Sequence, residues 1–434
     1  MIFRNFVICL LFISNIKSIN INLSLDNKNK DDFYPFIIDL NEPLRDNYNP
    51  IDLFVVFDIS KDMDNKKDTL INILKSIIDN LLSDDRLCLI YFDSDSKIYR
   101  PLSSIDNEKF LIEDIINNKI YKSKFLFRNE NRNYDRNYVS AIKNLMKEIE
   151  KSFVVNNGRV QSVIFIVSGY NTGREDPLKY LRNYENIAQY DFTMHTLCLF
   201  DSKELPDDLI DFSQVRDGTL YTFKSNMETQ YALNIIKALR TTKYKNVNIS
   251  IKSNYNITKF YGSRYLPYSS EIYKKNIFFP IFQFITGKEY TYVLLLELNK
   301  DEIKVGERIL FVNINYTDFK GNTYKSSKSL RFYNSINYFT FKKDEYCRVK
   351  ALEIVDKFKD MKYNIEEYKK SINNMDEDCN NYLNVKIGEI LKEIGEKSNF
   401  TNYNMNGILA EGFLKKGGIN FLYSNDYQLG LIGK

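Results

Sequence analysis

Apolar and polar positions follow three patterns along the chain. Residues 51–58 begin with a mostly apolar run and end on an aspartate, which predicts a strand buried on both faces. Residues 66–83 place apolar side chains three and four apart, the spacing of one helix face. From residue 244 the apolar positions alternate, as in half-buried strands, and from 344 to 395 the helical spacing returns. These patterns predict an α/β unit, a β unit and a helical unit.

The alternating region contains several candidate strands separated by turn-forming residues. They cover residues 246–251, 276–282, 290–298, 309–316, 327–332 and 336–341. Two more strand-like segments, residues 19–25 and 33–40, precede the α/β unit. We predict that they complete a β-sandwich, so that the α/β unit is an insertion between its strands.

The start of the chain resembles a secretory signal peptide. Arg4 is followed by an apolar run over residues 6–13, which is too short to span a bilayer. No later segment is long enough to do so, and we expect a secreted protein or one in the secretory pathway. The predicted organisation is a signal peptide over 1–18, sandwich strands over 19–49, the α/β domain over 50–242, the β-sandwich over 243–342, a helical module over 343–400 and a tail over 401–434.

Side chains bearing oxygen alternate where the first buried strand ends, at Asp58, Ser60 and Asp62. Oxygen ligands suit a hard cation such as Mg²⁺. The segment resembles the start of a von Willebrand factor A domain, whose metal-ion-dependent adhesion motif begins Asp-x-Ser-x-Ser. Further segments are similar, in order, to later parts of that family: 86–92 to its second strand, 99–102 to the segment after it, 163–168 to its fourth strand and 217–221 to its last.

The chain departs from this family at three of the five metal-binding positions. Asp62 stands where the family has serine, Arg136 where it has threonine, and Gly169 where it has aspartate. A slip of one residue brings Asp135 into the second loop, and Asp58, Ser60, Asp62 and Asp135 then form a different all-oxygen site for Mg²⁺. The alternative is a vestigial turn that caps the strand and the following helix.

The resemblance implies a doubly wound, mostly parallel sheet of strand order 3-2-1-4-5-6. Ligands of such sheets bind at the carboxyl ends of the strands where the order reverses. The residues expected on this face are Asp58, Ser60, Asp62, Arg136, Ser168 and Gly169, with Lys61, Asp64, Arg132 and Arg174 around them. Mixed charge of this kind favours a protein partner.

Composition argues against other classes of function. The chain has 61 Lys and Arg against 57 Asp and Glu, a formal charge of +4, which is too balanced to indicate nucleic-acid binding. Its one histidine, His195, lies in a predicted strand, which argues against zinc sites and histidine catalysis. The sequence also lacks a phosphate-binding glycine-rich loop. We therefore expect a protein that is not an enzyme.

The chain has five cysteines. Cys9 belongs to the predicted signal peptide, while Cys88 and Cys198 are expected to be buried free thiols on separate strands. Cys347 and Cys379 lie at opposite ends of a predicted helical hairpin, which favours a disulfide in an oxidising compartment. Two unpaired thiols are the alternative.

The order of units is similar to that of plant ubiquitin ligases with a von Willebrand factor A domain, and of the inter-alpha-trypsin inhibitor heavy chains. This chain has no Cys/His cluster for the RING of the ligases, so the ligase function does not carry over. Two functions remain. One is a secreted protein-binding or adhesion protein that uses the top of the A domain. The other is a structural component of a secretory compartment or extracellular layer.

Overall fold

The computed structural model describes the α/β unit and most of the β unit. The described residues are 18–25, 33–43, 49–105, 135–153, 158–183, 190–201, 209, 216, 218, 220–223, 228–261, 274–287, 290–298 and 303–332. The predicted strand 336–341, the helical module, the tail, and Cys9, Cys347 and Cys379 lie outside them. So does the predicted signal peptide, except for its last residue.

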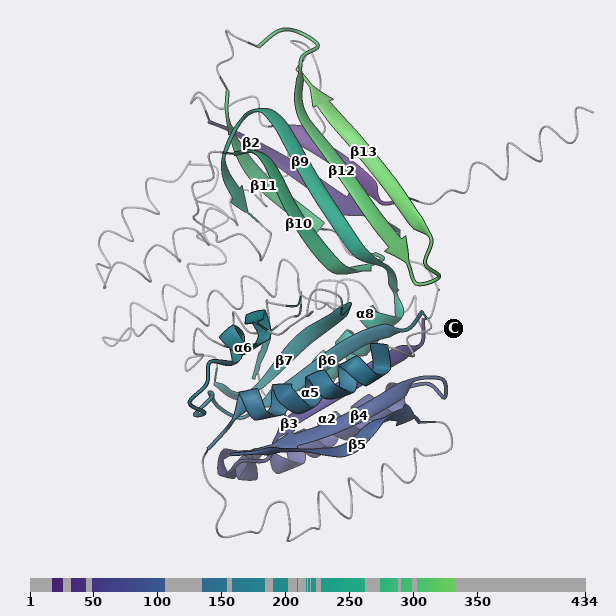
Figure 1. Ribbon diagram of the computed structural model, residues 1–434, viewed down its shortest axis with the longest axis vertical. Coiled ribbons are helices and arrows are strands. Elements are labelled where there is room, and N and C mark those ends of the chain that lie inside the picture. The colour runs from purple at the N-terminus through teal and green to yellow at the C-terminus, as the bar shows by residue number, and fades with distance from the viewer. Residues whose placement is uncertain are drawn as a thin grey trace, which may run out of the picture.

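A six-stranded sheet, here called sheet B, forms the centre of the α/β unit (Figure 1). Its strands are β3 (Ile51–Asp58), β4 (Arg86–Phe92), β5 (Ser96–Ser104), β6 (Val160–Val167), β7 (Phe192–Asp201) and β8 (Leu220–Phe223). They lie in the order β5-β4-β3-β6-β7-β8, and only the β4–β5 pair is antiparallel. The predicted order and its reversal beside β3 are therefore confirmed.

Helices cover both faces of sheet B (Figure 1). They are η1 (Lys61–Lys66), α2 (Lys67–Asn80), α5 (Tyr138–Phe153), α6 (Pro177–Asn183) and α8 (Glu228–Arg240). The apolar stripe of α2 packs with α8 on one face, and α5 packs against β4 and β5 on the other. None of the described helices is both long and apolar enough to cross a bilayer.

The β unit is one antiparallel sheet, here called sheet A. Its strands are β1 (Asn20–Leu25), β2 (Phe33–Asn41), β9 (Thr242–Tyr261), β10 (Lys274–Ile285), β11 (Tyr290–Glu297), β12 (Arg308–Asp318) and β13 (Thr323–Arg331). Their order is β1-β2-β11-β9-β12-β13, with β10 also paired to β9. Because β2 pairs with β11, segments from both sides of the α/β unit in the sequence join in this sheet.

Sheet A is nearly closed and barrel-like, which corrects the prediction of a two-sheet sandwich. Its two outermost strands, β1 and β13, lie side by side, and the backbone N–H of Ile19 donates to the Tyr316 hydroxyl at 3.3 Å. The 20-residue strand β9 makes this curvature possible. Its first half pairs with β10 and β12 and its second half with β11, so it carries the sheet around one core.

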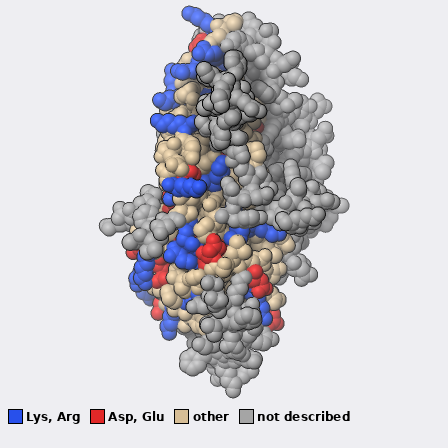
Figure 2. Space-filling model, turned by 90° about the vertical axis from the view of Figure 1, so that its right-hand side faces the viewer, with Lys and Arg blue, Asp and Glu red and all other residues tan. Residues whose placement is uncertain are grey.

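The outer surfaces of the two units differ in charge. On the face shown in Figure 2, Lys and Arg predominate over the described part of the sheet A half, whereas both signs mix over the α/β half. On β13 every second residue is exposed, including Lys325 and Arg331. The surface of sheet A is therefore polar and basic along this strand, while its apolar side chains face inward.

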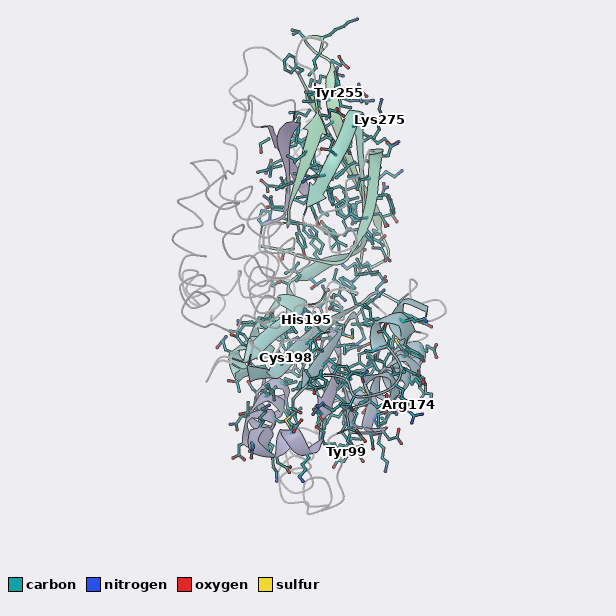
Figure 3. All side chains as sticks on the ribbon, turned by 90° about the vertical axis from the view of Figure 1, so that its left-hand side faces the viewer. Tyr99, Arg174, His195, Cys198, Tyr255 and Lys275 are labelled. Atoms are coloured by element: carbon teal, nitrogen blue, oxygen red, sulfur yellow. The ribbon has the colours of Figure 1, made fainter. Side chains whose placement is uncertain are left out.

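The two described cysteines and the histidine are buried residues of sheet B, and Figure 3 labels His195 and Cys198. Cys88 on β4 and Cys198 on β7 are buried free thiols, and β3 and β6 lie between their strands. The prediction for both is confirmed. His195 on β7 is only 3% exposed, as expected of a histidine within a strand.

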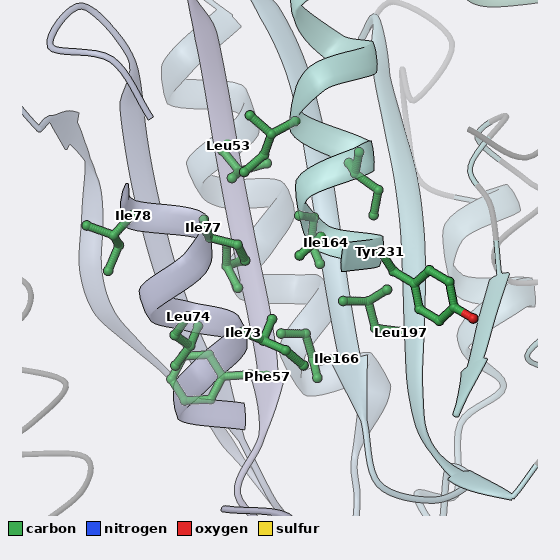
Figure 4. Packing of buried hydrophobic residues seen from close by; sticks show 14 of the residues in the cluster. Leu53, Phe57, Ile73, Leu74, Ile77, Ile78, Ile164, Ile166, Leu197 and Tyr231 are labelled. Carbon is green, nitrogen blue, oxygen red and sulfur yellow. The ribbon is translucent and has the colours of Figure 1, made fainter. Parts of the chain in front are cut away.

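Sheet A packs against the amino ends of the sheet B strands. The Gln283 side chain on β10 donates to the backbone carbonyls of Gln161 at 2.6 Å and Asp191 at 2.9 Å. Ile285 belongs to the core formed by α2, α8 and sheet B, part of which is shown in Figure 4. A Cβ on Gly158, just before β6, would lie 2.6 Å from the Phe319 carbonyl of the β12–β13 turn. This close packing covers the amino edge of sheet B.

Candidate functional site

The candidate site lies at the opposite, carboxyl edge of sheet B. Asp58 is the last residue of β3, and Ser168 follows the last residue of β6, its parallel neighbour. Gln161, near the start of β6, contacts sheet A. Ser168 lies seven residue steps beyond Gln161, or about 23 Å at about 3.3 Å per step. The site is therefore at the predicted topological position and remote from the contact between the sheets.

Asp58 and two serines form the buried centre of the site. The Asp58 carboxylate accepts hydrogen bonds from the Ser60 amide at 2.7 Å, the Ser168 amide at 3.1 Å and the Ser168 hydroxyl. The two serine hydroxyls lie 3.4 Å apart. Burial raises the pKa of the Asp58 carboxyl, and the hydrogen bonds from Ser168 and Ser60 oppose that shift. This carboxylate thus has its donors within the protein.

Arg136 fastens the neighbouring loops together. Its side chain is 4% exposed, and its guanidinium forms an ion pair with Asp62 and donates from Nε to the Tyr170 carbonyl at 2.8 Å. Its backbone N–H donates to the Thr172 hydroxyl at 2.6 Å, and its carbonyl accepts from the amides of Thr172 at 2.9 Å and Gly173 at 3.1 Å. One residue thereby connects the loops after β3 and β6.

Gly169 provides the space that the Arg136 guanidinium fills. A Cβ at Gly169 would lie 2.7 Å from Cζ of Arg136 and 2.8 and 3.0 Å from its two terminal nitrogens. The carbonyl of Gly169 accepts a hydrogen bond from the buried Tyr138 hydroxyl. The ring of Tyr170 lies 5.5 Å from Arg136 Cζ, within cation–π range. The guanidinium therefore lies where a larger residue at position 169 would place its side chain.

The four residues predicted to bind a metal are not brought together as one site. Asp58 and Ser60 adjoin each other, but the carboxylate of Asp62 pairs with Arg136, and Asp135 is exposed. No group of three or more His, Cys, Asp or Glu side chains within the described ranges is placed to hold an ion. Mg²⁺ needs about six oxygen ligands at about 2.1 Å. As arranged here, Asp58, Ser60, Asp62 and Asp135 do not supply the ligand set of a divalent cation.

Sequence reasoning missed three contributors to this edge. Tyr170 is 59% exposed and lies over Arg136, Tyr138 anchors the loop after β6, and the Lys66 ammonium donates to the Ser168 carbonyl at 3.3 Å. A lone aromatic residue in a polar loop could have indicated Tyr170. No local pattern indicates the other two contacts, because they join distant segments. Lys61 and Arg174 are exposed as expected (Figure 3 labels Arg174), and Arg132 lies outside the described residues.

Comparison with known proteins identifies the fold of the chain. No protein-family model matches the sequence, and no significant match was found among curated proteins. A von Willebrand factor type A protein from Catenulispora acidiphila has a TM-score of 0.66 at 10% identity, covering 91% of this chain and 96% of its own. The ArnB paralogue VWA2 from Sulfolobus acidocaldarius has a TM-score of 0.51 at 12% identity, covering 92% and 98%. These likenesses show a von Willebrand factor A fold.

Proposed function

We propose that this protein is a non-catalytic interaction module that binds a partner protein at the carboxyl edge of sheet B. The proposal rests on how far the rest of the protein covers each of the two edges. Sheet A lies against the amino edge, whereas Tyr170 at the carboxyl edge has 59% of its surface exposed. Tyrosine is enriched at the centres of protein interfaces, because it joins a large apolar ring to a polar tip.

The loop that carries Tyr170 is ordered before any partner arrives. The Arg136 side chain donates a hydrogen bond to the Tyr170 carbonyl, and the Tyr138 hydroxyl donates one to the Gly169 carbonyl. The two bonds hold two successive carbonyls of the loop backbone in place. The guanidinium of Arg136 also lies near the tyrosine ring. A side chain that is already held loses less conformational entropy on binding, which favours affinity.

Charges around Tyr170 support a protein partner. Lys61 and Arg174 are exposed at this edge, and so are Asp64 and Asp135. Both signs lie within the described loops, whereas a nucleic-acid surface would carry an excess of positive charge. A partner of mixed charge matches this pattern.

The chemistry of the site supports a role without catalysis. The hydroxyls of Ser60 and Ser168 face the buried carboxylate of Asp58, whose donors are amides and a hydroxyl. Nucleophilic catalysis by serine requires an adjacent general base, usually histidine. The one histidine, His195, lies buried within β7. Together with the segment resembling a signal peptide, this supports a secreted binding or adhesion protein.

A second function is a structural component of a secretory compartment or extracellular layer. Two features favour this alternative: Arg136 pairs with Asp62, and the Asp58 carboxylate accepts hydrogen bonds from within the protein. Both are expected of residues whose role is to hold the fold together. The two functions differ in whether a partner contacts Tyr170.

Position-specific cross-linking tests the proposed function. A photoreactive phenylalanine analogue is placed at Tyr170 in the full chain, and a matched control carries it at Phe278 on sheet A, which is 67% exposed. We expect a discrete cross-linked partner in extracts of the source cells from position 170 only. Tyr170→Ala should then weaken binding of that purified partner at least 10-fold, while Phe278→Ala should not. Equal cross-linking at both positions, or unchanged binding by Tyr170→Ala, would contradict the proposal.

A further inference from the structure

The contacts of Arg136 join three segments that are far apart in the sequence. Its guanidinium reaches Asp62 in η1 and the Tyr170 carbonyl after β6, and its own backbone lies just before α5. Within a cation site, a bound ion has this bridging role, because it collects oxygen ligands from separate loops. Here a covalently attached cation bridges two of those loops from the third.

The space and the charge at this edge both exclude a second cation. The guanidinium lies so close to Gly169 that a Cβ there would be 2.7 Å from Cζ, and it pairs with the carboxylate of Asp62. The Asp58 carboxylate already accepts three hydrogen bonds. Arginine does not deprotonate in proteins, so the positive charge stays at every working pH. A divalent ion would have to displace these donors and also approach a like charge.

We propose that Arg136 replaces a bound divalent cation as the group that orders the carboxyl edge, and that this edge works without Mg²⁺ or Mn²⁺. Arg136 is a positioning residue: it holds the loop that presents Tyr170 and is itself almost fully buried. The claim that this edge binds its partner without Mg²⁺ or Mn²⁺ rests on the proposed function. The claim that Arg136 takes the place of the ion does not. Partner contacts at this edge are then direct rather than bridged through a metal.

Calorimetric titration with MnCl₂ and MgCl₂ tests the exclusion of the ion. The full chain is compared with Asp62→Asn and Ser60→Ala, two mild changes at the edge. We expect no saturable binding up to about 1 mM, the upper end of the dissociation constants of the weakest Ca²⁺ sites in proteins. Saturable binding that both variants leave unchanged also supports the proposal, because the ion then lies elsewhere. Saturable binding that either variant weakens would overturn it.

Hydrogen exchange tests the ordering role of the guanidinium. Arg136→Lys keeps the charge but loses the fork that reaches Asp62 and the Tyr170 carbonyl together. We expect amide exchange over residues 168–173 to rise about 10-fold or more, while the central amides of β3 and β6 keep their protection. Arg174→Lys, at an exposed arginine of the same loop, is the control and should leave exchange unchanged.

Two results would overturn the ordering role. One is wild-type exchange over residues 168–173 in Arg136→Lys. The other is loss of protection throughout β3 as well as the loop, since that would indicate a general contribution to stability. Neither this experiment nor the titration involves a partner protein. Their failure can therefore be distinguished from failure of the proposed function, which depends on cross-linking at Tyr170.

Discussion

Arginine–aspartate pairs have different roles at the two edges of sheet B. At the amino edge, Asp52 accepts from Arg86 and Arg159, and Asp85 accepts from Arg240. These pairs close the base of the α/β unit, on the side where sheet A packs. At the carboxyl edge, the pair of Arg136 with Asp62 orders loops that no described element of sheet A covers. The same kind of ion pair therefore stabilises a covered edge at the amino side of sheet B and an uncovered edge at its carboxyl side.

The junction with sheet A explains why the amino edge is unsuited to an external partner. The Gln283 side chain donates hydrogen bonds to the backbone carbonyls of Gln161 and Asp191, and Ile285 of sheet A packs into the α/β core. Groups used in this way are buried and already satisfied. Changes at the amino edge should consequently affect stability, and changes at exposed positions of the carboxyl edge should affect binding.

The largest expected effect comes from Asp85→Ala at the amino edge. Asp85 is fully buried and accepts from the Ile51 amide at 2.8 Å, the Leu82 amide at 2.7 Å and the Arg240 guanidinium at 2.6 Å. Its loss leaves a buried guanidinium unpaired, and the free energy of unfolding should fall by about 3–5 kcal/mol. Urea denaturation of the full chain measures this.

Asp84→Ala is the matched control for that experiment, because Asp84 is the exposed neighbour of Asp85. It should change the free energy of unfolding by less than about 0.5 kcal/mol. Equal effects of the two substitutions would contradict the role assigned to the amino edge.

A smaller effect is expected from Gln283→Ala, which removes the link between the sheets. The two carbonyls that it contacts would lose their buried donor, at a cost of about 1–3 kcal/mol. Limited proteolysis should also cut faster in the segment that leads into β9. Gln230→Ala, at a half-buried glutamine on α8, should leave the cutting rate unchanged. Equal cutting of both variants would argue against a sealed junction.

A further expected effect concerns the pH dependence of stability at the carboxyl edge. Burial raises the pKa of Asp58 above 3.8, its ordinary value, so between the two values the folded chain holds a proton that the unfolded chain has released. The contribution of Asp58 to stability is therefore full below pH 3.8 and is lost as the pH rises through the folded pKa. The slope is at most about 1.4 kcal/mol per pH unit.

Asp58→Asn removes this titration. Its free energy of unfolding, relative to that of the wild type, should increase as the pH rises from 3.5 towards 7. The increase per pH unit should not exceed the slope that the release of one proton gives, about 1.4 kcal/mol. Urea denaturation at a series of pH values measures the difference. Parallel profiles for the two proteins would show that Asp58 does not titrate with a raised pKa.

The sequence predicts sheet B well because its central strands are buried on both faces. The apolar runs of 51–58 and 86–92 match β3 and β4, and the helix expected over 66–83 is α2 with shorter ends. Sheet A was harder to predict. Alternation reports that one face of a strand is buried, but not whether a second sheet or the same sheet curving back covers it. The strand expected over 246–251 is only part of β9, whose polar segment near Ser253 hides its continuation.

Two departures from the family pattern turn out to be one structural feature. Arginine replaces a threonine at position 136, and glycine replaces an aspartate at position 169. The sequence shows each as a separate loss of a metal ligand. The structure shows that the small residue makes room for the large one, with the guanidinium filling the space beside Gly169. No local pattern could reveal this, because the two residues meet only when β6 and α5 are in place.

A double-mutant cycle between Arg136 and Gly169 tests this central claim most directly. The free energy of unfolding is measured for the wild type, Gly169→Ala, Arg136→Ala and the double variant. Because the effect of alanine on the unfolded chain is common to both backgrounds, it cancels. Overpacking against the guanidinium should make Gly169→Ala cost about 1–3 kcal/mol in the wild type and less than about 0.5 kcal/mol beside Arg136→Ala. Costs that agree within about 0.5 kcal/mol in the two backgrounds would show that the guanidinium does not occupy this space.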